Sequence, residues 1–145
     1  MSYPPPVRLV LDTDVIVAAM RSPTGASAEL LRRADAGAVV LLLNVALALE
    51  YEAVCGRPDH LSAAGLLTSE MAVFVDQVIA MAIPVVSRFR WRPQLRDPGD
   101  ELVLEAAVNG QADAIVTFNR RDFAAAAQFG IAVRLPSEAL GSLPP

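Results

Sequence analysis

The acidic side chains that follow the first apolar segment are the first candidates for chemistry. Residues 7–11 (VRLVL) are short, apolar and partly β-branched, which predicts a buried strand, and Asp12 and Asp14 come directly after them. Two carboxylates this close repel each other unless a cation neutralises them. A bound metal ion is therefore one interpretation of the pair, and an N-cap at Asp12 for the following helix is the other.

Further oxygen-bearing side chains occupy comparable positions later in the chain. The apolar run 114–117 predicts another strand and is followed by Asn119 and Asp122, while Glu50 and Asp100 lie in predicted helices. Oxygen ligands with no histidine or thiolate beside them suit a hard cation such as Mg²⁺ or Mn²⁺. Such an ion can activate a water molecule and stabilise the leaving oxygen of a phosphodiester.

Several of these acids also have an ordinary structural interpretation. Asp100 and Asp122 each suit the N-cap of a helix, and Asp97 suits the turn before Asp100. Glu50 and Glu52 lie about 200° apart around their helix, so only one of them can face the site. An exposed glutamate on an ordinary helix remains the alternative for Glu50.

Basic and aromatic side chains near these acids offer a surface for RNA. An RNA backbone attracted to arginines, with a base stacked on a tryptophan, is a recognised arrangement, and a solvated loop is the alternative. A threonine hydroxyl at the end of a strand can orient a carboxylate or a phosphate. The candidate substrate-binding residues are Thr117, Arg120, Arg121, Arg90, Trp91 and Arg92.

The elements that must position these side chains alternate between strands and helices. The predicted strands are 7–11, 39–43, 84–86, 114–117 and 131–133. The predicted helices are 15–20, 26–36, 45–55, 100–109 and 122–129, with one long or two shorter helices in 61–82 and a final turn at 136–140. This order predicts an α/β sandwich around a mostly parallel sheet of about five strands, with ligands bound at the carboxyl ends of the strands.

Composition limits the class of protein. The 145 residues predict a single domain spanning 1–145, and a hydrophobic content of 54% excludes a mainly disordered chain. A net charge of −4 argues against a protein that coats nucleic acid through bulk charge, but it allows an enzyme with a local patch and a bound cation. No apolar run is long enough for a membrane span, the start lacks a secretory signal, and Cys55 is the single cysteine. We therefore expect a cytoplasmic protein.

Four segments stand out when taken together: residues 9–15 (LVLDTDV), 50–54 (EYEAV), 97–100 (DPGD) and 112–123 (ADAIVTFNRRDF). They resemble the PIN-domain nucleases, and most closely the branch that contains VapC-like toxins of toxin–antitoxin systems. The resemblance implies a PIN-like three-layer sandwich and a metal-dependent endoribonuclease that hydrolyses RNA with Mg²⁺ or Mn²⁺. It also implies a cognate antitoxin, and we expect a homodimer.

The resemblance also implies roles for individual residues. It assigns Asp12, Glu50, Asp100 and Asn119 as metal ligands, and Asp122 joins them as a catalytic candidate. Two positions depart from the family pattern. Asp14 stands where asparagine is commoner, and Asn119 stands where this branch often has aspartate.

Two other functions compete with the nuclease. The segment around Asp12 and Asp14 also resembles the nucleophile motif of haloacid-dehalogenase-type phosphatases, with Asp14 as general acid. That mechanism normally uses a lysine, and all 12 basic residues of this chain are arginine. The remaining alternative is a non-catalytic PIN-like module that binds RNA or a protein partner.

Overall fold

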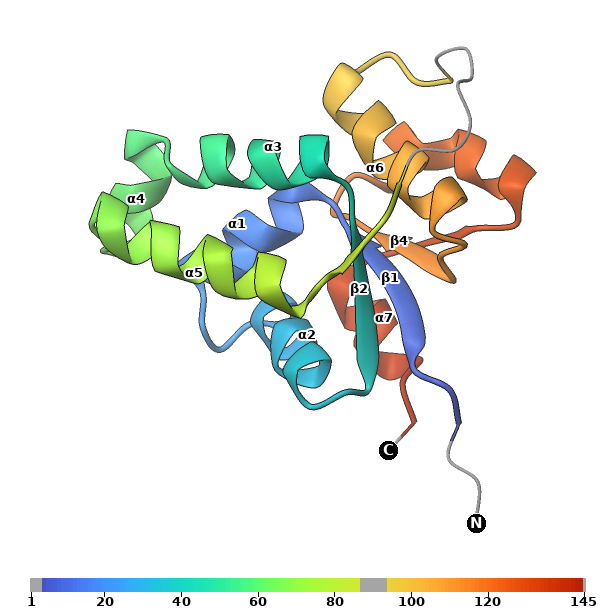
Figure 1. Ribbon diagram of the computed structural model, residues 1–145, viewed down its shortest axis with the longest axis horizontal. Helices are drawn as coiled ribbons and strands as arrows, with labels where there is room; N and C mark the ends of the chain where they lie inside the picture. The colour runs from blue at the N-terminus through green and yellow to red at the C-terminus, as the bar shows by residue number, and fades with distance from the viewer. Residues whose placement is uncertain (1–3, 87–93, 145) are drawn as a thin grey trace.

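The computed structural model describes residues 4–86 and 94–144 (Figure 1). Within these ranges, five strands form one sheet in the order β3-β2-β1-β4-β5, and every neighbouring pair is parallel. The strands are β1 (Val7–Leu11), β2 (Val39–Leu43), β3 (Ile83–Pro84), β4 (Ala114–Val116) and β5 (Ala132–Arg134). The predicted α/β fold with a parallel sheet is confirmed.

Helices cover the sheet on both sides and include one 3₁₀ segment. They are α1 (Thr13–Arg21), α2 (Ala26–Asp35), α3 (Val45–Cys55), α4 (Pro58–Ala64), α5 (Thr68–Met81), α6 (Pro98–Asn109), η1 (Arg120–Phe129) and α7 (Pro136–Gly141). Figure 1 shows α1, α3, α4 and α5 to the left of the sheet and α6 to its right. Because α3 and α6 also contact each other across the top of the sheet, they can carry side chains to the ends of β1 and β4.

The core explains why the ends of β1 and β4 are held firmly. Leu9, Val10 and Ile115 are at most 1% exposed, and Leu9 of β1 pairs with Leu41 of β2 on one side and Ala114 of β4 on the other. Burying one such aliphatic side chain stabilises the fold by about 1.5–3 kcal/mol. The two central strands that lead to the candidate site are therefore among the most rigidly packed parts of the molecule.

Several boundaries differ from those expected from the sequence. The segment 61–82 holds two helices, which is one of the two alternatives expected, but the first begins earlier, at Pro58. Gly65 has the left-handed backbone conformation (φ 69°) that ends α4. The third strand is Ile83–Pro84 rather than 84–86. In the described ranges no single helix has the length and apolarity to cross a membrane. Helices α4 and α5 reach that length and apolarity only when they are counted together, and they are bent by 89° relative to each other.

The start of α6 differs from the sequence prediction, which began this helix at Asp100 and allowed Asp100 as its N-cap. The helix begins at Pro98, and its N-cap is Asp97, whose Oδ1 accepts hydrogen bonds from the backbone N–H groups of Gly99 (2.7 Å) and Asp100 (3.4 Å). Proline suits the first position of a helix, where its missing N–H costs nothing. Because Asp97 takes the capping role, the side chain of Asp100 in the first turn is free of it.

Candidate active site

Asp12 stands where β1 ends and α1 begins, against the end of β4. Its backbone N–H donates to the carbonyl of Val116 (2.9 Å), which continues the pairing of β1 with β4. Its Oδ1 accepts a hydrogen bond from the Thr13 N–H (2.8 Å), and its Oδ2 accepts one from the Thr117 hydroxyl (2.8 Å). Asp12 is therefore both the N-cap of α1 and a buried carboxylate of fixed orientation, so the two interpretations of this residue are compatible.

Thr117 and Asn119 extend this hydrogen-bonded chain. The fully buried Thr117 hydroxyl donates to Asp12 and accepts a hydrogen bond from the Asn119 N–H (3.0 Å). A threonine at the end of β4 thus fixes the carboxylate at the end of β1. This position agrees with the orienting role that the sequence allowed for Thr117.

Asp14 faces the same loop from the first turn of α1. Its Oδ2 accepts hydrogen bonds from the Phe118 N–H (3.1 Å) and from Nδ2 of Asn119 (3.3 Å), whereas its buried Oδ1 has no hydrogen-bond partner. Burial, followed by the negative charge of Asp12, raises the pKa of Asp14 to about 7. The two positions that depart from the family pattern are therefore in direct contact.

Helix α3 brings Glu50 to this group from the side. A Cβ atom added to Gly99 at the start of α6 would lie 2.7 Å from Oε1 of Glu50, so a larger residue there would require this carboxylate to move. Burial, followed by the charge of Asp12 and then that of Asp97, raises the pKa of Glu50. Glu52 is exposed, which answers the question of which of the two glutamates approaches the site.

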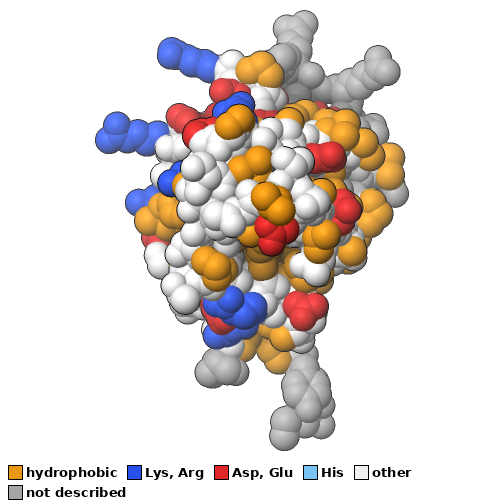
Figure 2. All heavy atoms as spheres, turned by 90° about the vertical axis from the view of Figure 1, so that its left-hand side faces the viewer, with side chains coloured by type: hydrophobic (Ala, Val, Ile, Leu, Met, Phe, Trp, Pro, Cys, Tyr) orange, Lys and Arg blue, Asp and Glu red, His pale blue; other side chains and the backbone are white. Residues whose placement is uncertain are grey.

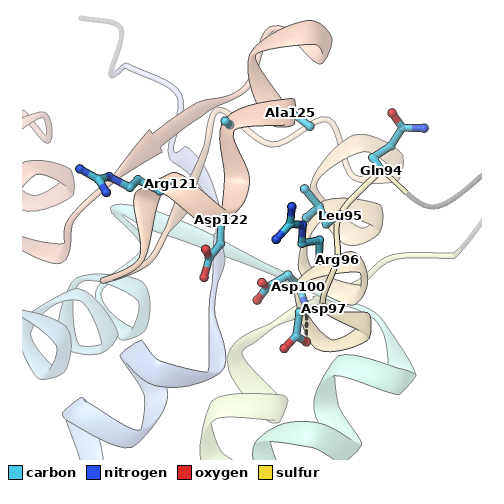
Figure 3. Close-up of a pocket in the computed structure, with 9 residues that line it drawn as sticks. Gln94, Leu95, Arg96, Asp97, Asp100, Arg121, Asp122 and Ala125 are labelled. Carbon is cyan, nitrogen blue, oxygen red and sulfur yellow. Dashed lines mark hydrogen bonds between the residues drawn. The ribbon is translucent and has the colours of Figure 1, made fainter.

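Asp100 and Asp122 complete the cluster on its open side. Both line a pocket of about 440 Å³ between α6 and η1, and Figure 3 shows their carboxylates pointing into the same space. Burial raises the pKa of Asp100 to about 7, and the charges of Asp12, Asp97 and Asp122 add to this effect. The structure therefore brings together all five acidic and amide residues that the sequence singled out as catalytic candidates: Asp12, Glu50, Asp100, Asn119 and Asp122.

Tyr51 is a supporting residue that the sequence interpretation missed. It is 2% exposed, and its hydroxyl donates a hydrogen bond to the backbone carbonyl of Leu11, immediately before Asp12. Burial, followed by the charge of Asp12, raises the pKa of this phenol well above its usual value. The sequence pattern that could have identified Tyr51 is its spacing of four residues from Leu47 and from Cys55, because this spacing marks the buried face of α3.

The donor set of this cluster fits a hard divalent cation. All of the facing groups carry oxygen, their charges raise one another's pKa values, and one buried oxygen of Asp14 is unpartnered. A cation would relieve this repulsion. In the described ranges, however, no three acidic, histidine or cysteine side chains already stand in position to hold a metal ion, so binding requires some of these carboxylates to turn.

The candidate substrate-binding arginines are placed differently from one another. Arg120 forms an ion pair with Glu138 (3.2 Å), while Arg121 lines the pocket beside Asp122. The other three candidates, Arg90, Trp91 and Arg92, lie outside the described residues.

Comparison with known proteins identifies the family to which this chain belongs. Residues 8–121 match the model of the PIN domain family, so the chain belongs to this family. The match covers Asp12, Glu50, Asp100 and Asn119 and ends just before Asp122. No curated protein matches the chain. PIN domains are generally nucleases and typically use divalent metal ions.

Proposed function

We propose that this PIN-domain protein is an endoribonuclease that hydrolyses RNA phosphodiester bonds with Mg²⁺ or Mn²⁺. The observation that carries the proposal is the meeting of carboxylates from β1, α3, α6 and η1 at the carboxyl edge of the sheet, each on a separate element. The pKa values of Asp12, Glu50 and Asp100 are all raised, first by burial and then by the charges of neighbouring carboxylates, and such shifts are common at functional sites.

Asp12, Glu50, Asp100 and Asn119 would hold the ion. When bound, the ion supplies Lewis-acid activation of water and charge stabilisation at the phosphate. Thr117 and the Thr13 N–H keep Asp12 in one orientation, which lowers the cost of organising the site. Asp122, on the far side of the pocket, would orient a water molecule or the leaving group.

The composition of the chain disfavours the phosphatase alternative. That mechanism normally uses a lysine to neutralise the phosphoryl group, and this chain has none.

We further propose that the enzyme is the toxin of a toxin–antitoxin pair, acting in the cytoplasm as a homodimer. The resemblance of the four motif segments supports this assignment. A groove of about 560 Å³ between α1, α2 and α5, lined by Met20, Leu31 and Phe74, offers an apolar surface for an antitoxin segment. Figure 2 shows further hydrophobic side chains, mixed with a few acidic ones, on the face formed by α3, α4 and α5. A small protein encoded beside this chain should copurify with it and block its activity.

RNA cleavage by purified protein tests the enzyme assignment. Cleavage is expected with Mn²⁺, is lost with a chelator and returns when Mn²⁺ is restored. Asp12→Asn should lower the rate by more than the roughly 100-fold that loss of a supporting residue costs. Absent or chelator-insensitive cleavage over a panel of RNAs would falsify the proposal. If the protein binds RNA without cutting it, the non-catalytic module would be favoured.

A further inference from the structure

The segment η1 holds part of the candidate site but has few anchors of its own. Asn119 directly precedes it, and Asp122 lies in its first turn. All ten residues of η1 are described, and two of them, Phe123 and Ala126, are buried. A 3₁₀-helix has poorer hydrogen-bond geometry than an α-helix, and long runs of it are uncommon. The position of Asp122 therefore depends on the contacts that η1 makes with its neighbours.

The start of η1, which is described throughout, has no side-chain cap. Asn119 is the N-cap residue, but no backbone N–H of η1 donates to its side chain, and its Nδ2 donates instead to Asp14 (3.3 Å). After the first turn, Phe123 departs from helical geometry (φ −112°, ψ 21°). The short stretch 120–122 is thus bounded by an uncapped end and a kink.

An ion pair with α7 holds this stretch in place. Nη1 of Arg120 lies 3.2 Å from Oε1 and 3.3 Å from Oε2 of Glu138. Oε1 of Glu138 also accepts a hydrogen bond from the N–H of Leu135, the N-cap of α7 (2.8 Å). The carboxylate is therefore oriented by its own helix, which lowers the entropic cost that usually makes exposed ion pairs weak.

The helix that supplies Glu138 is itself packed against the rest of the fold. Ala139, next to Glu138, is 1% exposed, and α7 contacts α2 and β5. Just before α7, the carbonyl of Arg134 accepts a hydrogen bond from the Thr117 N–H (2.9 Å), which joins the ends of β4 and β5. The ion pair thus ties the start of η1 to a well-packed part of the molecule.

We infer that Glu138 is a positioning residue, which acts through Arg120 to hold the first turn of η1 at the carboxyl edge of the sheet. Asn119 and Asp122 are held with it. In this role Arg120 is not a ligand of RNA, although the sequence made it a candidate for one. Glu138 lies beyond residues 8–121, which match the family model. The effect on catalysis rests on the proposed ribonuclease function, whereas the anchoring of η1 does not.

Substitutions at both ends of the ion pair test this role in the full-length protein. Glu138→Gln keeps an oxygen that can cap α7 but removes the charge that holds Arg120. Arg120→Gln removes the other charge, and the double variant removes both. Glu29→Gln on α2 is the matched control, because it breaks another exposed ion pair, with Arg32 (2.9 Å). The melting temperature should change little in all four variants, since the broken pairs are exposed.

Steady-state RNA cleavage with Mn²⁺ provides the first measurement. Each single variant of the pair should lower kcat about two- to fivefold, the range expected from an exposed ion pair, and leave KM for RNA close to that of the parent. The double variant should be no slower than either single variant, because both remove the same contact. Arg120→Lys, which keeps the charge, should retain most of kcat, and Glu29→Gln should match the parent.

Hydrogen–deuterium exchange measures the anchoring of η1 independently of activity. In Glu138→Gln, the backbone amides of η1 should exchange about two- to fivefold faster than in the parent, while those of α5 should not change. Glu29→Gln should leave exchange in η1 unchanged.

The possible results separate this role from the proposed function. If Glu138→Gln retains the parent's kcat, or if exchange in η1 is unchanged, Glu138 does not position this segment. If Arg120→Gln raises KM while Glu138→Gln leaves kcat unaltered, Arg120 is a ligand of RNA and the inference is wrong. If the parent cleaves no RNA but exchange in η1 responds as expected, the ribonuclease assignment fails and the anchor stands.

Discussion

The two sides of the carboxylate cluster are built differently. On the sheet side, Asp12 and Asp14 accept between them hydrogen bonds from Thr13, Thr117, Phe118 and Asn119. On the helix side, Glu50 and Asp100 come from α3 and α6, and neither carboxylate accepts a hydrogen bond from another described residue. Glu50 instead rests against Gly99.

This difference indicates that the two sides of the cluster have different roles. The sheet side is organised before any ligand binds, since its hydrogen bonds join the ends of two buried strands. The carboxylates of the helix side have no hydrogen-bond partner in the described ranges, so they can turn toward a cation or a nucleotide. We therefore expect substitutions on the sheet side to affect stability and activity together, and those on the helix side to affect ligand binding more than stability.

Removing the Thr117 hydroxyl should give the largest effect on the sheet side. Thr117→Val keeps the shape but leaves Oδ2 of Asp12 buried without a donor, which should destabilise the fold by about 1–3 kcal/mol. Mn²⁺ affinity or activity should also fall about 10- to 100-fold, as is typical when a residue supporting a metal ligand is lost. Denaturant unfolding and Mn²⁺ titration measure the two effects. Thr117→Ser, which keeps the hydroxyl, should retain most of both, and equal loss in the two variants would contradict this role.

Exchanging Asp14 and Asn119 should test whether they act as one unit. Asn119→Asp places a second carboxylate against Asp14 and should be less stable than the parent. Asp14→Asn keeps one acceptor oxygen and removes a charge that burial and Asp12 disfavour, so it should cost little stability. The double variant restores one carboxylate facing one amide. A double-mutant cycle by chemical denaturation should give a favourable coupling of about 0.5–3 kcal/mol, and additive single effects would contradict the unit.

Gly99→Ala should separate ligand binding from stability on the helix side. Alanine is favoured over glycine by up to about 1 kcal/mol inside a helix, but a Cβ here would also lie 3.0 Å from Oδ1 of the capping Asp97, so the melting temperature should change little. The new Cβ would nevertheless displace the Glu50 carboxylate, because it would lie 2.7 Å from Oε1. Mn²⁺ affinity should fall a few-fold as a result. Unchanged Mn²⁺ affinity would show that Glu50 need not occupy its observed position.

The dependence of stability on pH tests the charge repulsion within the cluster. Asp14 and Asp100 have pKa values of about 7 in the fold and 3.8 as the ordinary value, so between these limits the folded chain binds more protons than the unfolded chain. Their contribution to stability therefore decreases as the pH rises from about 4 to 7. In chelator, Asp100→Asn should melt with a weaker fall over this window than the parent, and Mn²⁺ should raise the melting temperature more at pH 8 than at pH 5. A fall as steep as in the parent would contradict this charge repulsion.

The sheet side could be predicted from sequence to a greater extent than the helix side. Asp12 and Thr117 follow apolar runs that become neighbouring parallel strands, so their meeting follows from the topology. The role of Asp97 as cap and the room that Gly99 leaves for Glu50 depend on how α3 approaches α6. That approach is set by packing between segments about fifty residues apart, and local patterns do not encode it.

Binding of Mn²⁺ tests most directly whether the two sides of the cluster form one cation site. Calorimetric titration of the parent should give saturable binding, which Asp12→Asn on the sheet side and Asp100→Asn on the helix side should each weaken by at least about tenfold. Asp76→Asn, which alters an exposed aspartate of α5, should bind like the parent. Equal Mn²⁺ affinity in the parent and in both cluster variants would contradict a shared cation site.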